Sequence, residues 1–390
     1  MEMFKKVLIV LLIWRIFLFG IQYFSTNIPY RDSFPYVDAV LNKYEPPFLR
    51  PWGNFDGVHY LTIAKSSYSA QYTQAFFPLY PLTIRWLGGS LFLKNYLISA
   101  QAISSFFWIL AIIMLVKLIE LDYKAKIAWQ TVTLLLLFPT SFYFISVYAE
   151  SMFLFFVLTS FYFARKGNWW CSGIFGALAS ATKLFGVFLF PALLVEHSLQ
   201  EKIDKIRIED KLFGVWNSFK KHLNCYLPIS ISTLGLILYM VYLKNEFNNP
   251  FYFATAQSAF GASRSVTKLV LLYQVFWRYF KMIVTVTKTS PLYFTVWLEF
   301  LSVVFFLFLL WQAYKQKIRL SYIIFAIFSL ITPTLTGTFS SMPRYVLILF
   351  PGFIAFGLIK NRKLVRFVYG LEIVLLVVCT IFFLRGYWVA

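Results

Sequence analysis

The sequence predicts an all-α polytopic membrane protein, a single bundle of about eleven transmembrane helices (range roughly 10–13) over residues 1–390. Hydrophobic residues make up 60% of the chain, charged residues only 13%, and the mean hydropathy is +0.70. A soluble domain carries about twice that share of charge. Long apolar runs recur along the whole chain, whereas the strands of a membrane barrel alternate apolar and polar residues. The spans are therefore predicted to be helices.

The apolar runs define the predicted helices in chain order. The first follows a basic N-terminus, and its apolar run is long with no small-residue cleavage site after it, so we interpret it as an uncleaved span. The fifth and sixth are short for a hydrocarbon core of ~30 Å, so they are broken, tilted or joined in one re-entrant pair. The predicted ranges are 7–24, 95–118, 127–145, 148–164, 169–182, 184–197, 225–243, 291–313, 321–337, 345–359 and 367–385.

Basic residues predict the orientation of the bundle. With the N-terminus in the cytoplasm, every short inner segment carries at least two Lys or Arg residues, as the positive-inside rule requires. The inner segments are MEMFKK, ELDYKAK, RKGN, the longer mixed-charge loop 198–224, KQKIR and KNRKLVR. The same bias explains the net charge of +20, so no nucleic-acid partner is expected.

Residues 266–287 are ambiguous between a twelfth span and a surface helix. A span here would move KQKIR and KNRKLVR to the outside. Lys268, Arg278 and Lys281 lie beside an aromatic stripe at helical spacing, which favours an amphipathic helix at the membrane interface. The outer face then carries two large loops, 25–94 and 244–290, and short turns near 146 and 338–344.

The first outer loop contains NFDGVHYLTIAKSSYSAQYTQAFFPLYPL, residues 54–82. DGVHYLTIA is typical of a short helix that Asp56 opens, and His59 and Tyr60 then share a face with Asp56. An amphipathic helix is predicted from Pro81, so the loop is expected to fold on the membrane surface. Asp56 either caps its helix or is a functional carboxylate, and the local sequence leaves both readings open.

Other charged residues are predicted at the outer ends of spans. Glu150 is either a helix-end acid or part of a site, and Lys183 and Arg344 either reach lipid headgroups or bind a ligand. Arg15 lies in mid-span, where a cation needs a partner. The three cysteines, Cys171, Cys225 and Cys379, lie far apart without metal-ligand spacing.

The predicted topology places polar residues from separate parts of the chain on the same side of the membrane. A carboxylate among several cations suits general-base chemistry on a hydroxyl, next to a phosphate that gains charge as it leaves. These residues are Asp56, His59, Glu150, Lys183, Gln257, Arg264 and Arg344.

Six motifs spread over most of the chain carry a resemblance to a known family. They are FDGVHYLTIAKSSY, AFFPLYPLTIR, FPTSFYFISVYAESMF, ALASATKLFGV, NNPFYFATAQSAFGASR and SSMPRYVLILFP. Each resembles a motif of the PIG-V-type mannosyltransferases (GPI mannosyltransferase II and its prokaryotic relatives), which are GT-C glycosyltransferases, and AFFPLYPLTIR is the most specific. Phe55, Ser67, Lys183 and Phe185 depart from the family pattern, which has Trp, Gly, Arg and Asn there. Lys183 keeps the charge but loses a bidentate fork.

The resemblance implies a GT-C-like bundle and an inverting enzyme. Such an enzyme moves a hexose, by analogy mannose, from a polyprenyl-phosphate donor in the membrane to a hydroxyl of a lipid-linked or cell-surface glycan. By the same analogy Asp56 is the general base. His59, Tyr60 and Glu150 orient the acceptor or the base. The implied donor-phosphate residues are Lys183, Arg344 and Arg264, and further site candidates are Gln257, Tyr80 and Arg85.

No metal ligand and no cofactor are assigned from the sequence, although some GT-C relatives use a divalent metal. The alternative function is a polytopic lipid or glycolipid transporter or flippase, for which polar spans and internal repeats would be expected. The short loops and the absence of an endoplasmic-reticulum retrieval signal favour a prokaryotic plasma membrane with an extracytoplasmic active site. In a eukaryote the site would face the lumen of the endoplasmic reticulum.

Overall fold

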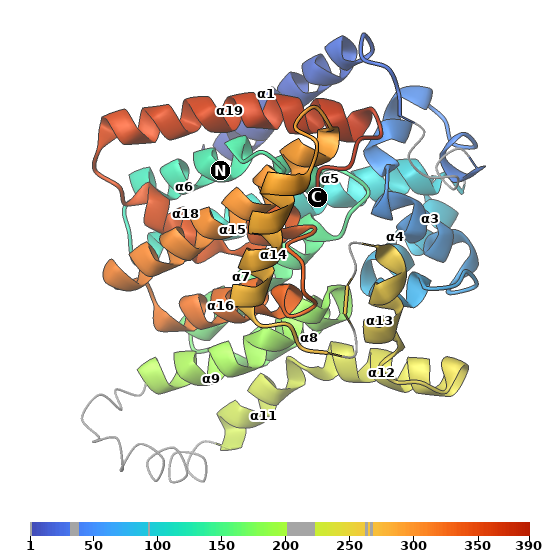
Figure 1. Ribbon diagram of the computed structural model, residues 1–390. Helices are drawn as coiled ribbons and strands as arrows, with labels where there is room; N and C mark the ends of the chain where they lie inside the picture. The colour runs from blue at the N-terminus through green and yellow to red at the C-terminus, as the bar shows by residue number, and fades with distance from the viewer. Residues whose placement is uncertain (1, 32–38, 93, 201–222, 262–263, 266–267) are drawn as a thin grey trace.

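The computed structural model describes residues 2–31, 39–92, 94–200, 223–261, 264–265 and 268–390, and all regular elements in these ranges are helices (Figure 1). Most of the predicted inner loop 198–224 lies outside the described residues. The all-α prediction is confirmed for the part of the chain that the structure describes.

Four of the described helices are long and apolar enough to cross a membrane: α1 (Glu2–Ser25), α5 (Tyr96–Glu120), α15 (Pro291–Lys315) and α19 (Arg362–Leu384). A bent pair, α11 (Leu223–Ile231) and α12 (Leu234–Phe247), forms a fifth candidate with a 46° bend. The shorter helices are α6 (Ala125–Leu137), α7 (Glu150–Arg165), α8 (Trp169–Thr182), α9 (Leu189–Gln200), α16 (Leu320–Thr334) and α18 (Phe350–Gly357). This architecture is that of a polytopic membrane protein, while the count of eleven spans stays a prediction.

The predicted helix 225–243 is bent between α11 and α12, and two further predicted helices are interrupted next to a proline. The helix predicted at 127–145 ends at Leu137, because Pro139 holds Phe138 in an extended conformation with ψ 139°. The helix predicted at 345–359 breaks at Leu349, just before α18, which has a proline in its first turn. The first break is followed by the short turn η3 (Ser141–Phe144), and the second is preceded by α17 (Met342–Tyr345) and η7 (Val346–Ile348).

The interrupted segments lie against a buried central helix. Most residues of α7 are buried, and α7 packs between α5 and α8. At one edge of the bundle α1 and α19 pack against each other (Figure 1). Non-helical backbone is tolerated at membrane depth only where protein surrounds it, and the residues at the two breaks, Phe138 and Leu349, are buried.

In its described residues, the predicted first outer loop is folded and includes several short elements. They are η1 (Pro47–Gly53), α3 (Asp56–Ser66), η2 (Thr73–Ala75) and α4 (Leu79–Ser90). α3 packs on α4, and α4 packs on α5, so the loop is attached to the bundle. In Figure 1 these elements gather at one end of the bundle together with α13 (Tyr252–Thr255). α4 begins at Leu79, two residues before Pro81, where the sequence predicted that this helix would start.

The second outer loop contains η6 (Ala256–Phe260) and α14 (Leu272–Thr285) after α13. α14 has 14 residues and is therefore about 21 Å long, too short for a full span. Tyr273, Trp277 and Phe280 are exposed along it, whereas Val275 and Tyr279 are buried. An exposed aromatic face of this kind suits a membrane interface, and that location stays a prediction.

Candidate functional site

Two charged clusters lie at opposite ends of α7. Glu150 is the first residue of this helix and Arg165 is its last. The helix has 16 residues, so the two ends are about 24 Å apart. The cluster at the Glu150 end brings together the acids and cations that the sequence analysis placed on the outer side.

Asp56 begins α3, and its carboxylate does not cap the helix. The N-cap position is Phe55, which has a φ of 59° and makes no side-chain cap hydrogen bond. Instead, Arg344 donates from Nη1 to Asp56 Oδ2 at 2.5 Å. The Asp56 backbone N–H donates to the hydroxyl of Tyr148 at 3.2 Å, and this hydroxyl donates to the Asn54 carbonyl at 2.9 Å. The reading of Asp56 as a helix cap is wrong.

The Asp56 carboxylate is ionised and partly open to ligands. Burial raises the pKa of Asp56, whereas the Arg344 guanidinium, and more weakly His59 and Arg264, lower it. The lowering is the larger effect, so the pKa lies below the ordinary value of 3.8. Among the described residues only Arg344 hydrogen-bonds to this carboxylate, through Oδ2. The side chain is 17% exposed. Oδ1 is therefore available to a substrate hydroxyl.

Glu150 is the second acid of the cluster, and it is almost completely buried at 1% exposure. Lys183, which follows the last residue of α8, donates from Nζ to Glu150 Oε1 at 2.5 Å. Arg344 Nε lies 3.6 Å from the same oxygen, so Arg344 links both acids. Glu150 Oε2 is buried and has no hydrogen-bond partner in the described part of the chain.

Three tyrosines that the sequence analysis missed surround the Arg344 guanidinium. Its carbon lies 5.6 Å from the ring centre of Tyr143, and 5.2 Å from those of Tyr148 and Tyr345. Cation–π contacts of this kind hold a guanidinium in place. The signal was present in the motifs, because Tyr148 lies two residues before Glu150 and Tyr345 directly follows Arg344.

Arg264 differs from the other two cations in its partners. It donates from Nη1 to Gln257 Oε1 at 2.8 Å and from Nη2 to Ser341 Oγ at 3.4 Å. No carboxylate of the described residues lies within 4 Å of Arg264, whereas Lys183 and Arg344 are each ion-paired. Arg264 is thus the cation of this cluster whose charge is not neutralised by an adjacent acid.

His59 and Tyr60 line the same region through ring contacts. The His59 ring stacks on Phe76 at 5.0 Å and meets the edge of Phe260 at 5.3 Å. Burial lowers the pKa of His59, although Asp56 opposes this, so the imidazole is neutral at pH 7. Tyr60 is buried, with its ring 5.1 Å from that of Phe76.

Tyr80 and Arg85, which the sequence analysis named as further site candidates, make contacts between helices, and their role in the site stays a prediction. The Tyr80 hydroxyl is bonded to Ser104 Oγ at 2.8 Å, which joins α4 to α5. Arg85 donates to the carbonyls of Ile63 and Ala64 at 2.7 and 2.6 Å, near the end of α3, where C=O groups lack partners within the helix.

Arg15, for which the sequence identified no partner, is bonded to a neutral residue. Its Nη2 donates to Gln101 Oε1 at 2.9 Å. The guanidinium also lies over the rings of Phe19 and Trp52, at 4.5 and 5.1 Å. These contacts stabilise a cation within a span without an adjacent acid.

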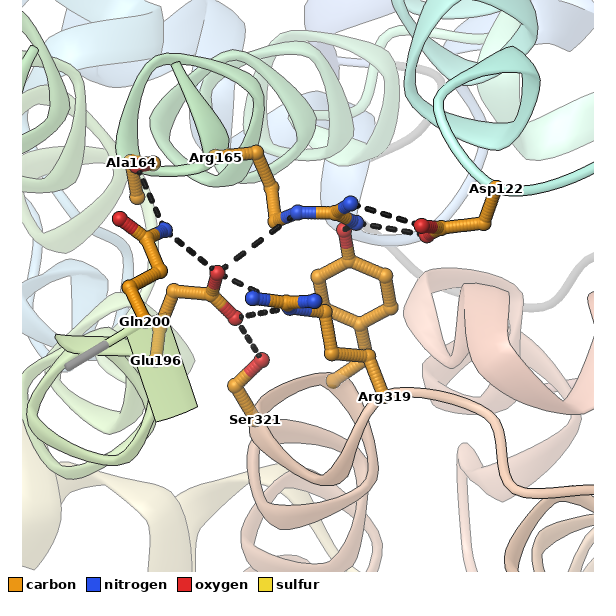
Figure 2. Close-up of polar contacts among 8 residues, drawn as sticks. Asp122, Ala164, Arg165, Glu196, Gln200, Arg319 and Ser321 are labelled. Atoms are coloured by element: carbon orange, nitrogen blue, oxygen red, sulfur yellow. Dashed lines mark hydrogen bonds and ion pairs between the residues drawn. The ribbon is translucent and has the colours of Figure 1, made fainter. Parts of the chain in front are cut away.

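The cluster at the other end of α7 is fully paired (Figure 2). Arg165 binds Asp122 with two hydrogen bonds of 2.6 and 2.7 Å and lies 3.7 Å from Glu196. Arg319 donates to both oxygens of the completely buried Glu196, and Ser321 donates to one of them. Three predicted inner segments, ELDYKAK, RKGN and KQKIR, thus meet at the end opposite Asp56. In this cluster the two acids, Asp122 and Glu196, are paired with the two cations Arg165 and Arg319.

The residues present do not form a divalent-metal site. Within the described ranges, no group of three or more His, Cys, Asp or Glu side chains lies close enough together to hold a metal ion. Both acids near the proposed site, Asp56 and Glu150, are paired with cations. No step below depends on a metal.

The fold and the site define a helical membrane protein with a carboxylate–cation cluster at one end of its bundle. A family model described as mannosyltransferase (PIG-V) matches residues 3–250. The chain belongs to the PIG-V mannosyltransferase family and is a glycosyltransferase enzyme. No curated protein and no solved structure matches the chain.

Family membership confirms the resemblance drawn from the motifs, while a prokaryotic origin stays a prediction. The matched region contains Asp56, Glu150 and Lys183, and Arg264 and Arg344 lie beyond it. Membership also implies a sugar donor and a glycan acceptor, and it does not favour the transporter or flippase alternative.

The buried Glu150–Lys183 pair leads to a stability prediction. Lys183→Met removes the nearest cation from a buried carboxylate, and we expect it to destabilise the fold by about 3 kcal/mol. Lys183→Met combined with Glu150→Gln removes both charges, so most of this stability should return. Thermal unfolding of the purified variants in detergent measures both. An equal loss in the single and double variants would show that the pair contributes through packing and not through charge.

Proposed function

We propose that the protein is an inverting mannosyltransferase that uses a polyprenyl-phosphate-linked sugar as donor. Asp56 Oδ1 accepts the proton of an acceptor hydroxyl, and the hydroxyl oxygen attacks the anomeric carbon of the donor sugar. The bond between that carbon and the phosphate oxygen breaks, and its electron pair stays on the phosphate. The acceptor is a hydroxyl of a lipid-linked or cell-surface glycan.

The leaving phosphate requires positive charge, and the cluster supplies it from three cations. Arg264 has no adjacent acid, and it is held by Gln257 and Ser341. Lys183 and Arg344 each donate one hydrogen bond to an acid of the cluster. An ammonium carries three N–H donors and a guanidinium five, so one such bond does not use all of them. The negative charge that develops during departure is thereby stabilised.

The observation that carries the proposal is the Asp56 carboxylate, which is ionised and partly exposed among these cations. Glu150, His59 and Tyr60 surround it and are suited to orient the acceptor. In the second charged cluster, by contrast, the central acid Glu196 is completely buried and both of its carboxylate oxygens accept hydrogen bonds from Arg319.

The decisive experiment is turnover by the purified protein. It is incubated with polyprenyl-phosphate mannose and, separately, with other polyprenyl-phosphate hexoses, and release of the polyprenyl phosphate is followed. Release from the mannose donor in the presence of a glycan acceptor is the expected result. A folded preparation that consumes none of these donors with any acceptor tried would contradict the proposal.

The active site is proposed to face outward, which predicts the labelling of two exposed positions. In a variant without native cysteines, Ser69→Cys should react with an impermeant thiol reagent in intact cells. Lys315→Cys, at the end of α15 and also exposed, should react only after permeabilisation. The reverse pattern would place the site in the cytoplasm and exclude a donor presented on the outer face.

A further inference from the structure

Glu299 is a buried acid that the proposed reaction does not use. It lies within α15 and is 4% exposed. Tyr279 of α14 donates its hydroxyl proton to Glu299 Oε2 at 2.5 Å. The same hydroxyl accepts the backbone N–H of Phe339 at 3.1 Å. One carboxylate therefore orients a tyrosine that in turn holds the backbone near Arg344.

α14 and the residues before it form hydrogen bonds with most of the segment 335–341. Arg278 donates to the Gly337 carbonyl at 3.0 Å. The backbone N–H groups of Ser265 and Val270 donate to the carbonyls of Thr336 and Leu335, at 2.8 and 3.0 Å. This segment leads directly into α17, which carries Arg344. Its backbone is therefore held from one side along most of its length.

Glu299 also lies near the segments that carry Arg344 and Asp56. Besides Tyr279, the backbone of Ser341 and the side chain of Trp388 are close enough to influence its carboxylate. Ser341 is the N-cap residue of α17. The Trp388 ring meets the ring of Phe55 edge-on at 5.2 Å, and Phe55 directly precedes Asp56. Hydrogen bonds connect Glu299 to the segment of the cation through Tyr279, and Trp388 places the segment of the carboxylate nearby.

We propose that Glu299 and Tyr279 are positioning residues that hold Arg344 against Asp56. Neither touches the ion pair, and they act through the backbone of residues 338–341. Losing the Tyr279 hydroxyl leaves the Phe339 N–H without an acceptor and releases the segment. The expected loss of catalytic activity rests on the proposed role of Asp56. The expected loosening of the segment 338–341 does not depend on that role.

The test is Tyr279→Phe in the full chain, with Tyr322→Phe as its matched control. Tyr322 is also a buried tyrosine, and its hydroxyl accepts a hydrogen bond from Arg165 at the opposite end of α7. In Tyr279→Phe we expect roughly tenfold faster hydrogen exchange in peptides covering 335–345 and a roughly tenfold lower kcat/KM, the scale of one net hydrogen bond. The acid limb of the pH–rate profile should also move to higher pH, because Arg344 is held less firmly. Tyr322→Phe should leave all three unchanged.

Glu299 is tested by a conservative and a disruptive change. Glu299→Gln keeps an oxygen that accepts the Tyr279 proton and should retain most activity, whereas Glu299→Leu should behave as Tyr279→Phe does. Unchanged exchange in Tyr279→Phe would overturn the proposal, and so would faster exchange with wild-type kcat/KM and pH profile. If the wild type transfers no sugar, the proposed function fails, and the exchange data alone then decide whether Tyr279 holds the segment.

Discussion

Asp56→Asn is expected to lower kcat by about 10²–10⁴-fold, the usual contribution of a general base. Asparagine keeps the shape of the side chain and one oxygen that accepts the hydrogen bond of Arg344. It cannot take a proton from the acceptor hydroxyl at neutral pH. Donor binding should change little, because the three cations remain. Steady-state kinetics with a polyprenyl-phosphate sugar measure kcat and the donor KM separately.

The chain offers a matched control for this change. Asp122→Asn also replaces one acid of an Asp–Arg pair, but at the opposite end of α7. Both variants lose a comparable ion pair, so a general effect of charge removal on the fold would lower activity in both. Near-normal turnover by Asp56→Asn would refute the base assignment, and Glu150 would become the next candidate.

Arg344→Gln is expected to lower kcat/KM by about 10²–10³-fold, the loss typical of one charge-stabilising donor. The variant removes the group that joins Asp56 to Glu150 and one of the cations near the proposed phosphate position. Arg344→Lys should fall between Gln and the wild type, because a lysine keeps the charge but not the fork that reaches both acids. Equal, near-normal activity in both variants would remove Arg344 from the site.

The pH profile separates the effect of Arg344 on Asp56 from its effect on the donor. A base must be deprotonated, so activity is lost as the pH falls through the pKa of Asp56. In the wild type that pKa lies below 3.8, because Arg344, aided by His59 and Arg264, outweighs burial. Without Arg344, burial prevails and raises the pKa, so the acid limb of kcat/KM should move to higher pH. An unchanged limb would show that Arg344 does not control the base.

Local pattern was sufficient to predict most of the helices. The predicted range 169–182 coincides with α8. The ranges predicted for six other helices differ from the observed bounds only at their ends; these helices are α1, α5, α7, α15, α16 and α19. These helices follow from apolar runs that are long compared with the uncertainty of their ends. The breaks after Leu137 and at Leu349 were not predicted, because the residues around them are as apolar as a span.

The candidate site was predicted as a set of residues, but its pairing was not. The family motifs, and a predicted topology that puts these residues on one side of the membrane, pointed to Asp56, Glu150, Lys183 and Arg344. They did not show that Arg344 binds Asp56 or that Lys183 binds Glu150. The sequence also did not show that Arg85, a further site candidate, donates to carbonyls near the end of α3, because those acceptors are 21 and 22 positions away along the chain.

Hydropathy and basic-residue bias are local properties, so the helical membrane class and the predicted sidedness could be derived residue by residue along the chain. The family motifs are likewise short, and they located the acid of the first outer loop. The contact between Asp56 and Arg344 joins residues 288 positions apart. It exists only because the folded loop, α7 and the interrupted helix around α17 meet at one end of the bundle. Only the tertiary structure therefore decided which cation is paired with which acid. It also showed that Arg264, among the described residues, is the cation of this cluster without an adjacent carboxylate.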